Sequence, residues 1–254
     1  MSVSSFSTDE VLGLLSTGEM EIEGLLPWSS NYTFLVKIIG NHPAPDARDK
    51  DGQVMAVYKP RRGEAPLWDF PDGTLCQREL AAYLVSLALG WNLVPPTVLR
   101  SGGHGLGSVQ LYIENDADQH YFTFRDDPRY CDQLKRLVAF DLITNNADRK
   151  SGHCLLDKEG HVWAIDHGIT FNVDYKLRTV IWDFAGQPIP AEMLADMQRL
   201  LNELGAKQAL GKALRKLLED SELAAFKRRT QGLVDLTQFP GPNRSQRSIP
   251  WPPV

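Results

Sequence analysis

The sequence has few cysteines, no long apolar run and no secretory leader, and each absence excludes a class of protein. Its 254 residues include three cysteines, Cys76, Cys131 and Cys154, too few and too far apart for a disulfide framework or a CxxC metal knuckle. We therefore expect a reducing compartment. The longest apolar run, around 81–89, is far shorter than the ~20 residues that cross a bilayer. The first residues carry acids where a secretory signal has basic groups, so we expect a soluble, cytoplasmic protein with no transmembrane segment.

A surplus of positive charge is also absent. The chain carries 27 lysines and arginines against 32 aspartates and glutamates, a formal net charge of −5. Bulk attraction to nucleic acid or to an anionic membrane needs the opposite sign, so no nucleic-acid partner is expected. The composition that is present, 43% hydrophobic and 23% charged, is typical of a globular protein, and the length suits one large domain or two small lobes.

Hydrophobic periodicity predicts a strand-rich first part and a mainly helical remainder. The first part is expected to hold a capped helix, five strands and one strongly apolar helix, at 7–18, 20–26, 32–40, 54–59, 75–89, 94–99 and 107–113. In the remainder, helices are expected at 131–145, 191–204, 207–218 and 221–236, with a short strand pair at 154–156 and 162–165. The fold class is therefore α+β, with a β-rich N-lobe at 1–112, an α-helical C-lobe at 113–237 and an irregular proline-rich tail at 238–254 that has little to pack. A cleft between two such lobes is a common ligand site.

Two aspartates carry the main chemical signal. Asp148 lies in NNADRKSGH (145–153) and Asp166 in AIDHG (164–168), and each is next to a predicted strand end. The hairpin expected between them would bring both carboxylates to one edge. Phosphoryl transfer needs such a pair, because one carboxylate acts on the acceptor hydroxyl and another holds Mg²⁺ on the phosphates.

A lysine and a glutamate upstream complete this pattern. Lys59 ends a predicted strand, where a lysine can neutralise nucleotide phosphates, and Glu79 lies early on the apolar helix. Leu80, Tyr83 and Leu84 flank Glu79 and would leave its carboxylate poorly solvated, so it needs a cation. Lys59 is the candidate.

Five segments, in order, resemble the phosphatidylinositol 3-/4-kinase superfamily, and most closely its type II phosphatidylinositol 4-kinases. They are AVYKP (56–60), RELAAYL (78–84), VPPT (94–97), DR (148–149) and IDHG (165–168). More narrowly, the chain resembles small bacterial phosphatidylinositol-kinase-like proteins of unassigned substrate. The resemblance runs from about residue 25 to 185. It implies a two-lobed protein-kinase-like fold and a phosphotransferase that uses ATP and Mg²⁺ or Mn²⁺.

Carried over by position, the resemblance assigns a role to each charged residue. It implies Lys59 on the phosphates, Glu79 as its partner, Asp148 as the catalytic acid/base and Asp166 as a metal ligand. The family has asparagine as the second metal ligand, whereas this sequence has His153 at that place. Either His153 binds Mg²⁺ or Mn²⁺ weakly, or it contacts phosphate, or the second metal is absent; a structural histidine is an equal alternative.

The resemblance also places the nucleotide-binding backbone. The turn with Ser29, Ser30 and Asn31 would cover the phosphates with small side chains in place of a Gly-x-Gly-x-x-Gly loop, although a plain hairpin turn fits it equally well. Gln110 and Tyr112 fall where the adenine-binding connector belongs, in a segment that also reads as a core strand.

Other functions remain open at this point. No basic acceptor loop for an inositol lipid is evident beyond Lys176 and Arg178, so the acceptor is a protein, a lipid or a small molecule. A nucleotide-binding pseudokinase or an AMP-transferring enzyme on the same fold is the alternative. A metal hydrolase built on His153, Asp166 and His167 is disfavoured, because neighbouring residues of a strand point to opposite faces. The oligomeric state has no signature in the sequence.

Overall fold

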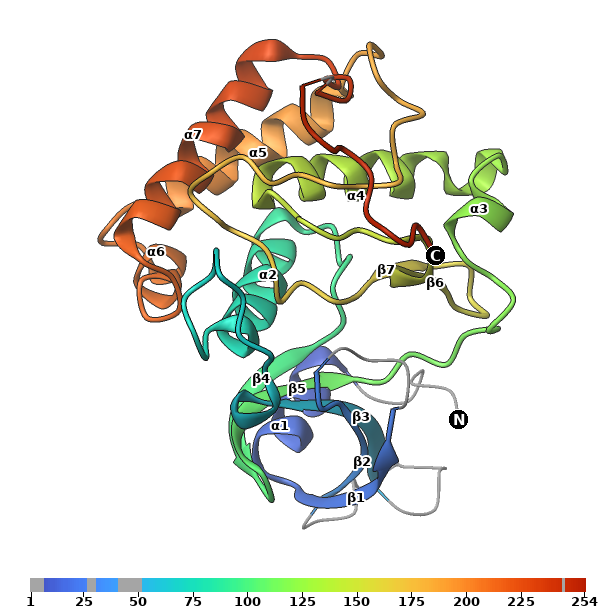
Figure 1. Cartoon of the computed structure of the whole chain (residues 1–254), viewed down its shortest axis with the longest axis vertical. Helices are drawn as coiled ribbons and strands as arrows, with labels where there is room; N and C mark the ends of the chain where they lie inside the picture. Colours follow the sequence, from blue (N-terminus) through green and yellow to red (C-terminus); the bar gives the residue numbers. More distant parts are fainter. Residues whose placement is uncertain (1–6, 27–30, 41–51, 244) are drawn as a thin grey trace. The chain divides into compact units, whose positions relative to one another are not determined.

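The chain folds into two compact units (Figure 1). Unit 1 comprises residues 1–80 and 95–114, and unit 2 comprises residues 81–94 and 115–254. The computed structural model describes residues 7–26, 31–40, 52–243 and 245–254. The domain boundaries expected at 112 and 237 stay a prediction.

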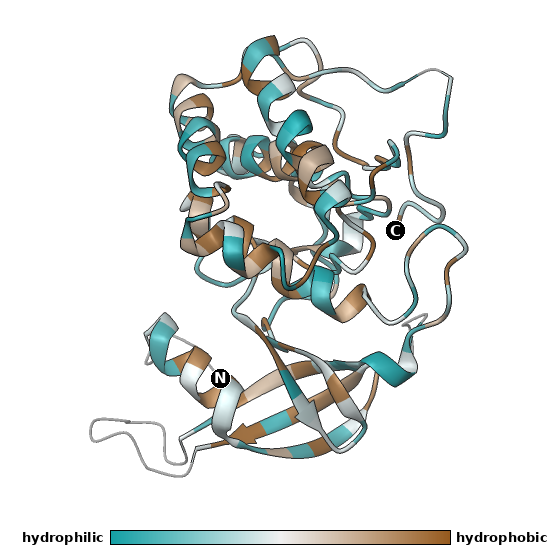
Figure 2. Ribbon diagram, turned by 90° about the vertical axis from the view of Figure 1, so that its left-hand side faces the viewer, coloured by the Kyte–Doolittle hydropathy of each residue, from teal (hydrophilic) through white to brown (hydrophobic). Residues whose placement is uncertain are grey.

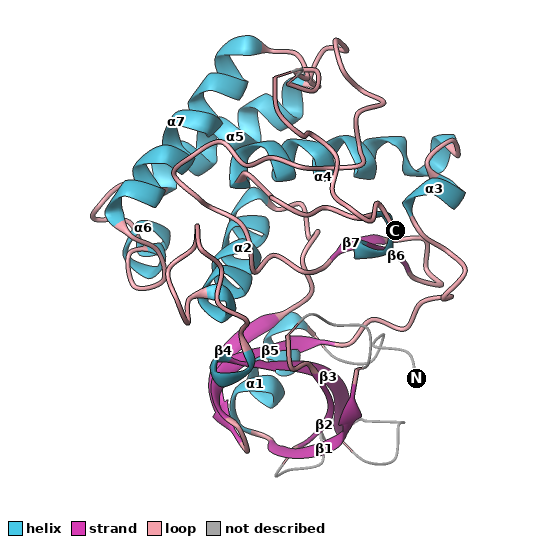
Figure 3. Cartoon of the chain, viewed as in Figure 1, coloured by secondary structure: helices cyan, strands magenta, loops and turns pink. Residues whose placement is uncertain are grey.

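Unit 1 is built on a five-stranded antiparallel sheet in the order β1-β2-β3-β5-β4, which Figure 3 shows in magenta as a curved layer. Its strands are β1 (Glu19–Leu25), β2 (Phe34–Ile39), β3 (Gln53–Pro60), β4 (Thr97–Gly102) and β5 (Gly105–Leu111). Alternate residues of β3 are buried, as the two-residue period of a strand requires. Figure 2 shows hydrophobic and hydrophilic residues mixed along these strands in the same way. β4 begins later than predicted because Pro95 and Pro96 have no amide to donate to the ladder.

Helix α1 (Thr8–Thr17) packs on this sheet. Ser7 and Glu10 form a capping box at its start, which satisfies amides that have no partner within the helix. At its other end, Arg100 of β4 donates to the carbonyl of Leu15 over 3.0 Å. The helix is thereby fastened to the sheet at both its apolar face and its carboxyl end.

Helix α2 (Leu75–Leu89) has the predicted bounds. Glu64 caps it from the preceding loop, because its carboxylate accepts from the amides of Leu75 and Cys76 over 3.1 and 2.8 Å. A carboxylate at this end also complements the helix dipole. This cap determines where the helix begins, and therefore where Glu79 lies, one turn further on.

The apolar stripe expected along α2 is wrong in part. Tyr83 is buried, but Leu87 is 48% exposed, and Leu80 and Leu84 are only half-buried. The fully buried residues include Leu89 and four smaller ones, Ala81, Ala82, Val85 and Ser86. Small side chains let a helix pack closely on more than one face, and a 3-4 spacing of leucines does not reveal this.

Unit 2 contains most of the helices and a two-stranded sheet. Its elements are α3 (Tyr121–Phe124), α4 (Cys131–Thr144), β6 (Cys154–Leu156), β7 (Val162–Ala164), α5 (Ala191–Glu203), α6 (Ala209–Leu214) and α7 (Asp220–Leu236). Helix α7 packs against both α4 and α5, and Phe171 meets Phe226 edge to face at 5.3 Å in the core. Helix α3 was not predicted, since four residues are too few for a periodicity. Among the described residues, none of the helices has both the length and the apolar composition that a bilayer crossing requires.

The segment 238–254 forms neither helix nor strand in its described residues. The expectation that it has little to pack is wrong, because Phe239 is 2% exposed. The backbone of Phe239 also exchanges hydrogen bonds with Gly186 and Gln187 over 2.8 and 3.0 Å. Prolines prevent regular structure, but they leave carbonyls free to accept hydrogen bonds from the rest of the unit.

Candidate active site

Lys59 and Glu79 form an ion pair in unit 1. Lys59 lies at the end of β3 in register with Ser108 of β5, and its Nζ is 2.6 Å from Oε1 of Glu79. The Glu79 side chain is 3% exposed, whereas that of Lys59 is 23% exposed. A buried carboxylate is stable only with such a partner. The pair therefore holds an ammonium group in one place while leaving part of it in contact with solvent.

A glycine allows the neighbouring strand to approach this lysine. Gly107 of β5 pairs with Pro60, the residue after Lys59. A Cβ atom at position 107 would lie 2.7 Å from Cα of Pro60, closer than real carbon atoms come. Only glycine therefore fits this place in the sheet.

Asn31 is tied to the chain that follows β3. Its Oδ1 accepts from the amide of Ala65 over 2.7 Å, so this side chain orders the loop between β3 and α2. Ser29 and Ser30, predicted with it as the phosphate-covering turn, lie outside the described residues. That role stays a prediction for all three.

The two residues of the predicted adenine connector are engaged within unit 1. Gln110 is 7% exposed and its amide donates to Oγ1 of Thr97 over 2.9 Å. The backbone amide of Tyr112 donates to the carbonyl of Met55 over 3.0 Å. Their contact with a nucleotide stays a prediction, and these hydrogen bonds hold β5 and the residue after it in the sheet.

In unit 2, the loop that carries Asp148 begins with a sharp helix stop. Asn145 ends α4 in the left-handed conformation, with φ 56° and ψ 51°, which asparagine tolerates better than most residues. Its amide group donates to the carbonyls of Asn172 and Asp174 over 3.0 and 2.6 Å. Next to it, Oδ1 of Asn146 accepts from the Asp148 amide over 2.9 Å. The chain direction at Asp148 is thus set by two side-chain amides.

Asp148 is a partly buried carboxylate among charged groups. Its side chain is 29% exposed, and Nζ of Lys150 is 3.5 Å from its Oδ2. Burial raises the pKa of Asp148, and the charge of Asp166 acts in the same direction, while Lys150 and Arg178 oppose both. A carboxyl group whose pKa is raised toward neutrality takes up a proton more readily, as a general base must.

His153 lies between Asp148 and Asp166. Its Nδ1 is 3.0 Å from the carbonyl oxygen of Asp148 and 3.5 Å from the amide nitrogen of Lys150. Its Nε2 is 3.4 Å from Oδ2 of Asp166. Asp166 is 48% exposed and adopts a positive φ of 61°, a strained conformation of the kind found at functional sites. An imidazole nitrogen and a carboxylate oxygen thus meet at a place that solvent reaches.

This pair could provide part of a metal site. In the ranges that the structure describes, no group of three or more histidines, cysteines, aspartates and glutamates is arranged to hold a metal. A divalent ion bound by Asp166 and His153 would therefore need ligands from outside the chain, and Mg²⁺ commonly takes them from phosphates and water. The hydrolase built on three protein ligands is wrong, because His167 is fully buried and faces Arg149.

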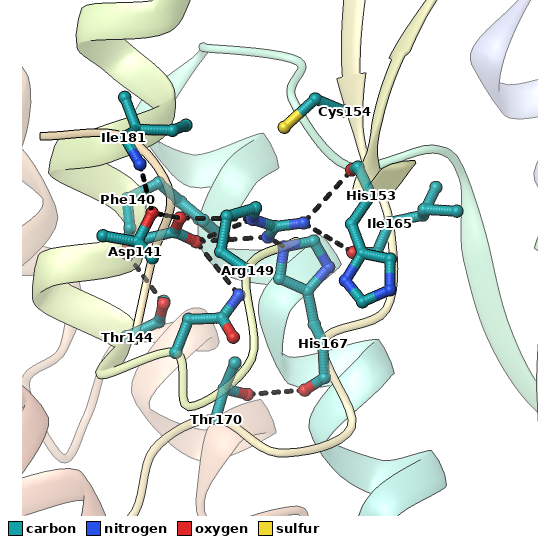
Figure 4. A network of polar contacts seen from close by, with 12 residues as sticks. Phe140, Asp141, Thr144, Arg149, His153, Cys154, Ile165, His167, Thr170 and Ile181 are labelled. Atoms are coloured by element: carbon teal, nitrogen blue, oxygen red, sulfur yellow. Dashed lines mark hydrogen bonds and ion pairs between the residues drawn. The ribbon is translucent and has the colours of Figure 1, made fainter. Parts of the chain in front are cut away.

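A buried arginine joins the two loops (Figure 4). Arg149 is inaccessible to solvent, and its Nε donates to both carboxylate oxygens of Asp141 on α4 over 3.1 Å. Its Nη1 donates to the carbonyls of Ile165 and His153 over 2.7 and 3.2 Å. Its Nη2 is 2.7 Å from Nε2 of His167, and because a guanidinium group only donates, this imidazole is neutral. The residues next to Asp148 and Asp166 are therefore attached to one another and to α4.

Asp141 is the anchor of this network. Besides Arg149, its carboxylate accepts from the side chains of Asn146 and Thr179 over 3.0 and 3.2 Å. Burial is the largest influence on Arg149 and works against its charge, but Asp141 together with other negative groups, Asp166 among them, keeps the pKa of Arg149 above its usual range. Arg149 and Asp141 therefore form a hydrogen-bonded buried ion pair, in which each charge depends on the other.

Sequence reasoning did not find the roles that four residues have around this site. Asp141, Arg149 and His167 support the loops, and Lys150 lies beside the carboxylate of Asp148. One signal was available for Asp141. It occupies the same helix face as Leu134, Leu137 and Val138, all buried, and an acid in that position requires a cationic partner. Nothing in the spacing identified Arg149 as that partner.

We expect the replacement Arg149→Lys to lower the free energy of unfolding by about 3–5 kcal/mol, because lysine cannot serve the carboxylate, two carbonyls and an imidazole together. Urea unfolding measures this. Arg129→Lys is the matched control. Arg129 pairs with Asp127 at the surface with 75% of its side chain exposed, and we expect a change of at most about 1 kcal/mol there. Equal losses of unfolding free energy in the two variants would contradict a stabilising role for the contacts of Arg149.

The raised pKa of Asp148 predicts a pH-dependent stability. Below its ordinary value of 3.8, the carboxyl group is protonated in both the folded and the unfolded chain, so burial costs nothing extra. Above the raised pKa, the folded chain carries a poorly solvated carboxylate that the unfolded chain exposes to water, and the folded state is destabilised. We therefore expect Asp148→Asn to have a higher Tm than the parent at pH 7, with the difference disappearing near pH 3. A lower Tm of Asp148→Asn than of the parent at pH 7 would contradict a raised pKa of Asp148 in the folded chain.

Comparisons with known proteins agree on one family. The family model for phosphatidylinositol 3- and 4-kinase matches residues 103–226, which include Asp148, His153 and Asp166. Protein Rv2133c of Mycobacterium tuberculosis (strain ATCC 25618 / H37Rv) is 38% identical over 278 residues, which cover 96% of this chain and 95% of that protein.

A solved structure supports the predicted fold. The crystal structure of a Helicobacter pylori proinflammatory kinase, CtkA, superposes with a TM-score of 0.50 at 10% identity and covers 88% of this chain and 94% of its own. At that identity the likeness concerns the fold alone, and it confirms the α+β, kinase-like architecture. With the matches in sequence and the grouping of Asp148, His153 and Asp166 in unit 2, it leads to one conclusion: the chain belongs to the phosphatidylinositol 3- and 4-kinase family, whose fold is that of kinase-like phosphotransferases.

Proposed function

We propose that this protein is an ATP-dependent phosphotransferase that uses Mg²⁺ or Mn²⁺ and transfers the γ-phosphoryl group to a hydroxyl group. The grouping of Asp148, His153 and Asp166 on two loops joined by Arg149 carries this proposal. In the reaction, a bond forms between the acceptor oxygen and the γ-phosphorus, the bond from that phosphorus to ADP breaks, and the hydroxyl proton is taken up by the protein.

Asp148 is the group that takes this proton. Its carboxylate is partly exposed, so an acceptor hydroxyl can reach it, and burial raises its pKa in the direction that favours protonation. Lys150, with Nζ 3.5 Å from that carboxylate, restrains its position and offsets negative charge nearby. General acid–base groups of this kind contribute factors of about 10²–10⁴ to rate.

Asp166 and His153 would hold the metal ion. Their facing Oδ2 and Nε2 atoms offer one hard and one softer ligand, and imidazole favours Mn²⁺ over Mg²⁺ more than the family's asparagine would. A divalent ion bound there neutralises charge on the phosphate oxygens. Arg149 maintains this arrangement by holding the carbonyls of His153 and Ile165.

Lys59 would neutralise the nucleotide phosphates. Glu79 orients its ammonium group through the 2.6 Å contact, which lowers the entropy lost when the lysine binds an anion.

The test of this function is the turnover of Asp148→Asn. We expect a loss of about 10²–10⁴-fold in transfer of the labelled γ-phosphoryl group, assayed separately with lipid vesicles, proteins and hydroxylated metabolites. Nucleotide binding, measured by calorimetry, should persist. Asp118→Asn, an acid exposed at the surface, is the matched control and should retain full turnover. ATP bound by the parent without any transfer would contradict the proposal in favour of a pseudokinase, and a protein mass increase equal to AMP would indicate AMP transfer.

The metal assignment is tested by two neighbouring replacements. We expect Asp166→Ala to abolish metal-dependent ATP binding, because it removes the carboxylate ligand. His153→Asn should shift the preference from Mn²⁺ toward Mg²⁺, because an amide oxygen is the harder ligand. Calorimetric titration with each metal measures both. An unchanged metal preference in His153→Asn would show that His153 is not a ligand.

A further inference from the structure

Residues 248–254, here called the strap, lie against the loop that carries Asp148. The amide of Ser151, three residues after Asp148, donates to the carbonyl of Pro253 over 2.8 Å. The amide of Thr179 and the indole Nε1 of Trp182 each donate to the carbonyl of Ser248 over 3.1 Å. Figure 1 shows the strap as the red trace that ends beside β6 and β7, and Ser151 begins the 3₁₀ turn that leads into β6.

The donors that the strap satisfies are buried. Ser151 and Thr179 are both inaccessible to solvent. A buried amide that loses its acceptor is left with neither a hydrogen bond nor hydration, so these two amides need the strap or a substitute for it. The contact therefore belongs to the packed structure of unit 2.

Residues 178–180 form a second connection between the strap and the loop that carries Asp148. The amide of Arg149 donates to the carbonyl of Arg178, and the amide of Val180 donates to the carbonyl of Arg149, over 2.9 and 3.1 Å. The hydroxyl of Thr179 reaches Asp141. A movement of the strap would therefore reach Arg149 by two routes, directly through Ser151 and indirectly through Thr179.

The sequence of the strap suits this role. Pro250, Pro252 and Pro253 have no amide of their own, so the segment presents carbonyl acceptors and few donors to satisfy. Their restricted φ angles also lower the entropy lost on ordering. The large side chains of Ile249 and Trp251 are 50% and 76% exposed, whereas Pro250 is buried. The hydrogen bonds to the strap are accepted by its backbone carbonyls.

We propose that the strap positions the catalytic loop, by accepting hydrogen bonds from Ser151, Thr179 and Trp182, and that phosphoryl transfer depends on it. Ser248 and Pro253 are thus positioning residues, which act on Asp148 and His153 through the loop. The effect on turnover rests on the proposed function, whereas the effect on the loop does not.

The first test compares the full chain with a chain that ends after Arg247. Amide hydrogen exchange at Ser151 and Thr179 should be faster by about tenfold or more in the shorter chain. Turnover should fall on the order of 10–100-fold, with KM for ATP little changed, because a misplaced catalytic group affects the chemical step most. Adding the peptide SIPWPPV should restore turnover, and a scrambled peptide should not. Ile249→Ser, which alters an exposed side chain and keeps both carbonyls, should retain turnover and exchange rates.

A second pair of variants applies if the shorter chain does not fold. Ser151 is the first residue of a 3₁₀ turn, and Lys150 before it is extended at ψ 164°, the conformations that proline and its preceding residue prefer. Ser151→Pro removes only the amide that binds the strap, whereas Ser151→Ala keeps it. We expect exchange at Thr179 and turnover to change more in the proline variant than in the alanine variant.

Each outcome decides the inference. Unchanged exchange at Ser151 in the shorter chain would show that the strap does not protect this amide and would overturn the inference, whatever the turnover. Faster exchange with unchanged or increased turnover would overturn its positioning role, and an increase would identify an inhibitory segment. If the full chain transfers no phosphate, the proposed function fails, and faster exchange alone then still supports the strap as the holder of the loop.

Discussion

The buried guanidinium group of Arg149 is the interaction on which the site in unit 2 depends. A charge without contact to water is stable only if its donors are satisfied and a counter-charge is near. Asp141, two backbone carbonyls and one neutral imidazole meet these requirements. Because those partners come from α4 and from both functional loops, the solvation of one charge requires the loops to be correctly placed.

In this arrangement the residues that hold the loops are different from the candidate catalytic residues. Arg149, Asp141 and His167 are fully buried, while Asp148, His153 and Asp166 keep part of their surface in contact with solvent. Rigid, buried partners hold the exposed groups near a working geometry, so little reorganisation is needed when a ligand binds. Unit 1 follows the same rule on a smaller scale, with the buried Glu79 holding the partly exposed Lys59.

Family membership and local geometry answer different questions about this protein. The resemblance to the family predicted roles for a strand lysine and then two aspartates, Lys59, Asp148 and Asp166, in that order along the chain. The geometry shows how His153 is held: its Nδ1 contacts the loop backbone, and its Nε2 faces Asp166. It also shows that carbonyls of the proline-rich segment 248–254 accept hydrogen bonds from the amides of Ser151 and Thr179, although its composition suggested that it has little to pack.

Local patterns in the sequence predicted most of the helices and strands of this protein to within a few residues, although not the short helix α3. Periodicity and turn residues act over short distances, so α2 and the β6–β7 pair could be predicted directly, and the need of a buried acid for a cation predicted the partner of Glu79. Only the tertiary structure decided which faces of α2 are buried and which arginine neutralises Asp141. It also decided which backbone amides donate hydrogen bonds to a segment that is distant in the sequence. These depend on which side chains lose contact with water together, and that is determined by packing between residues far apart in the chain.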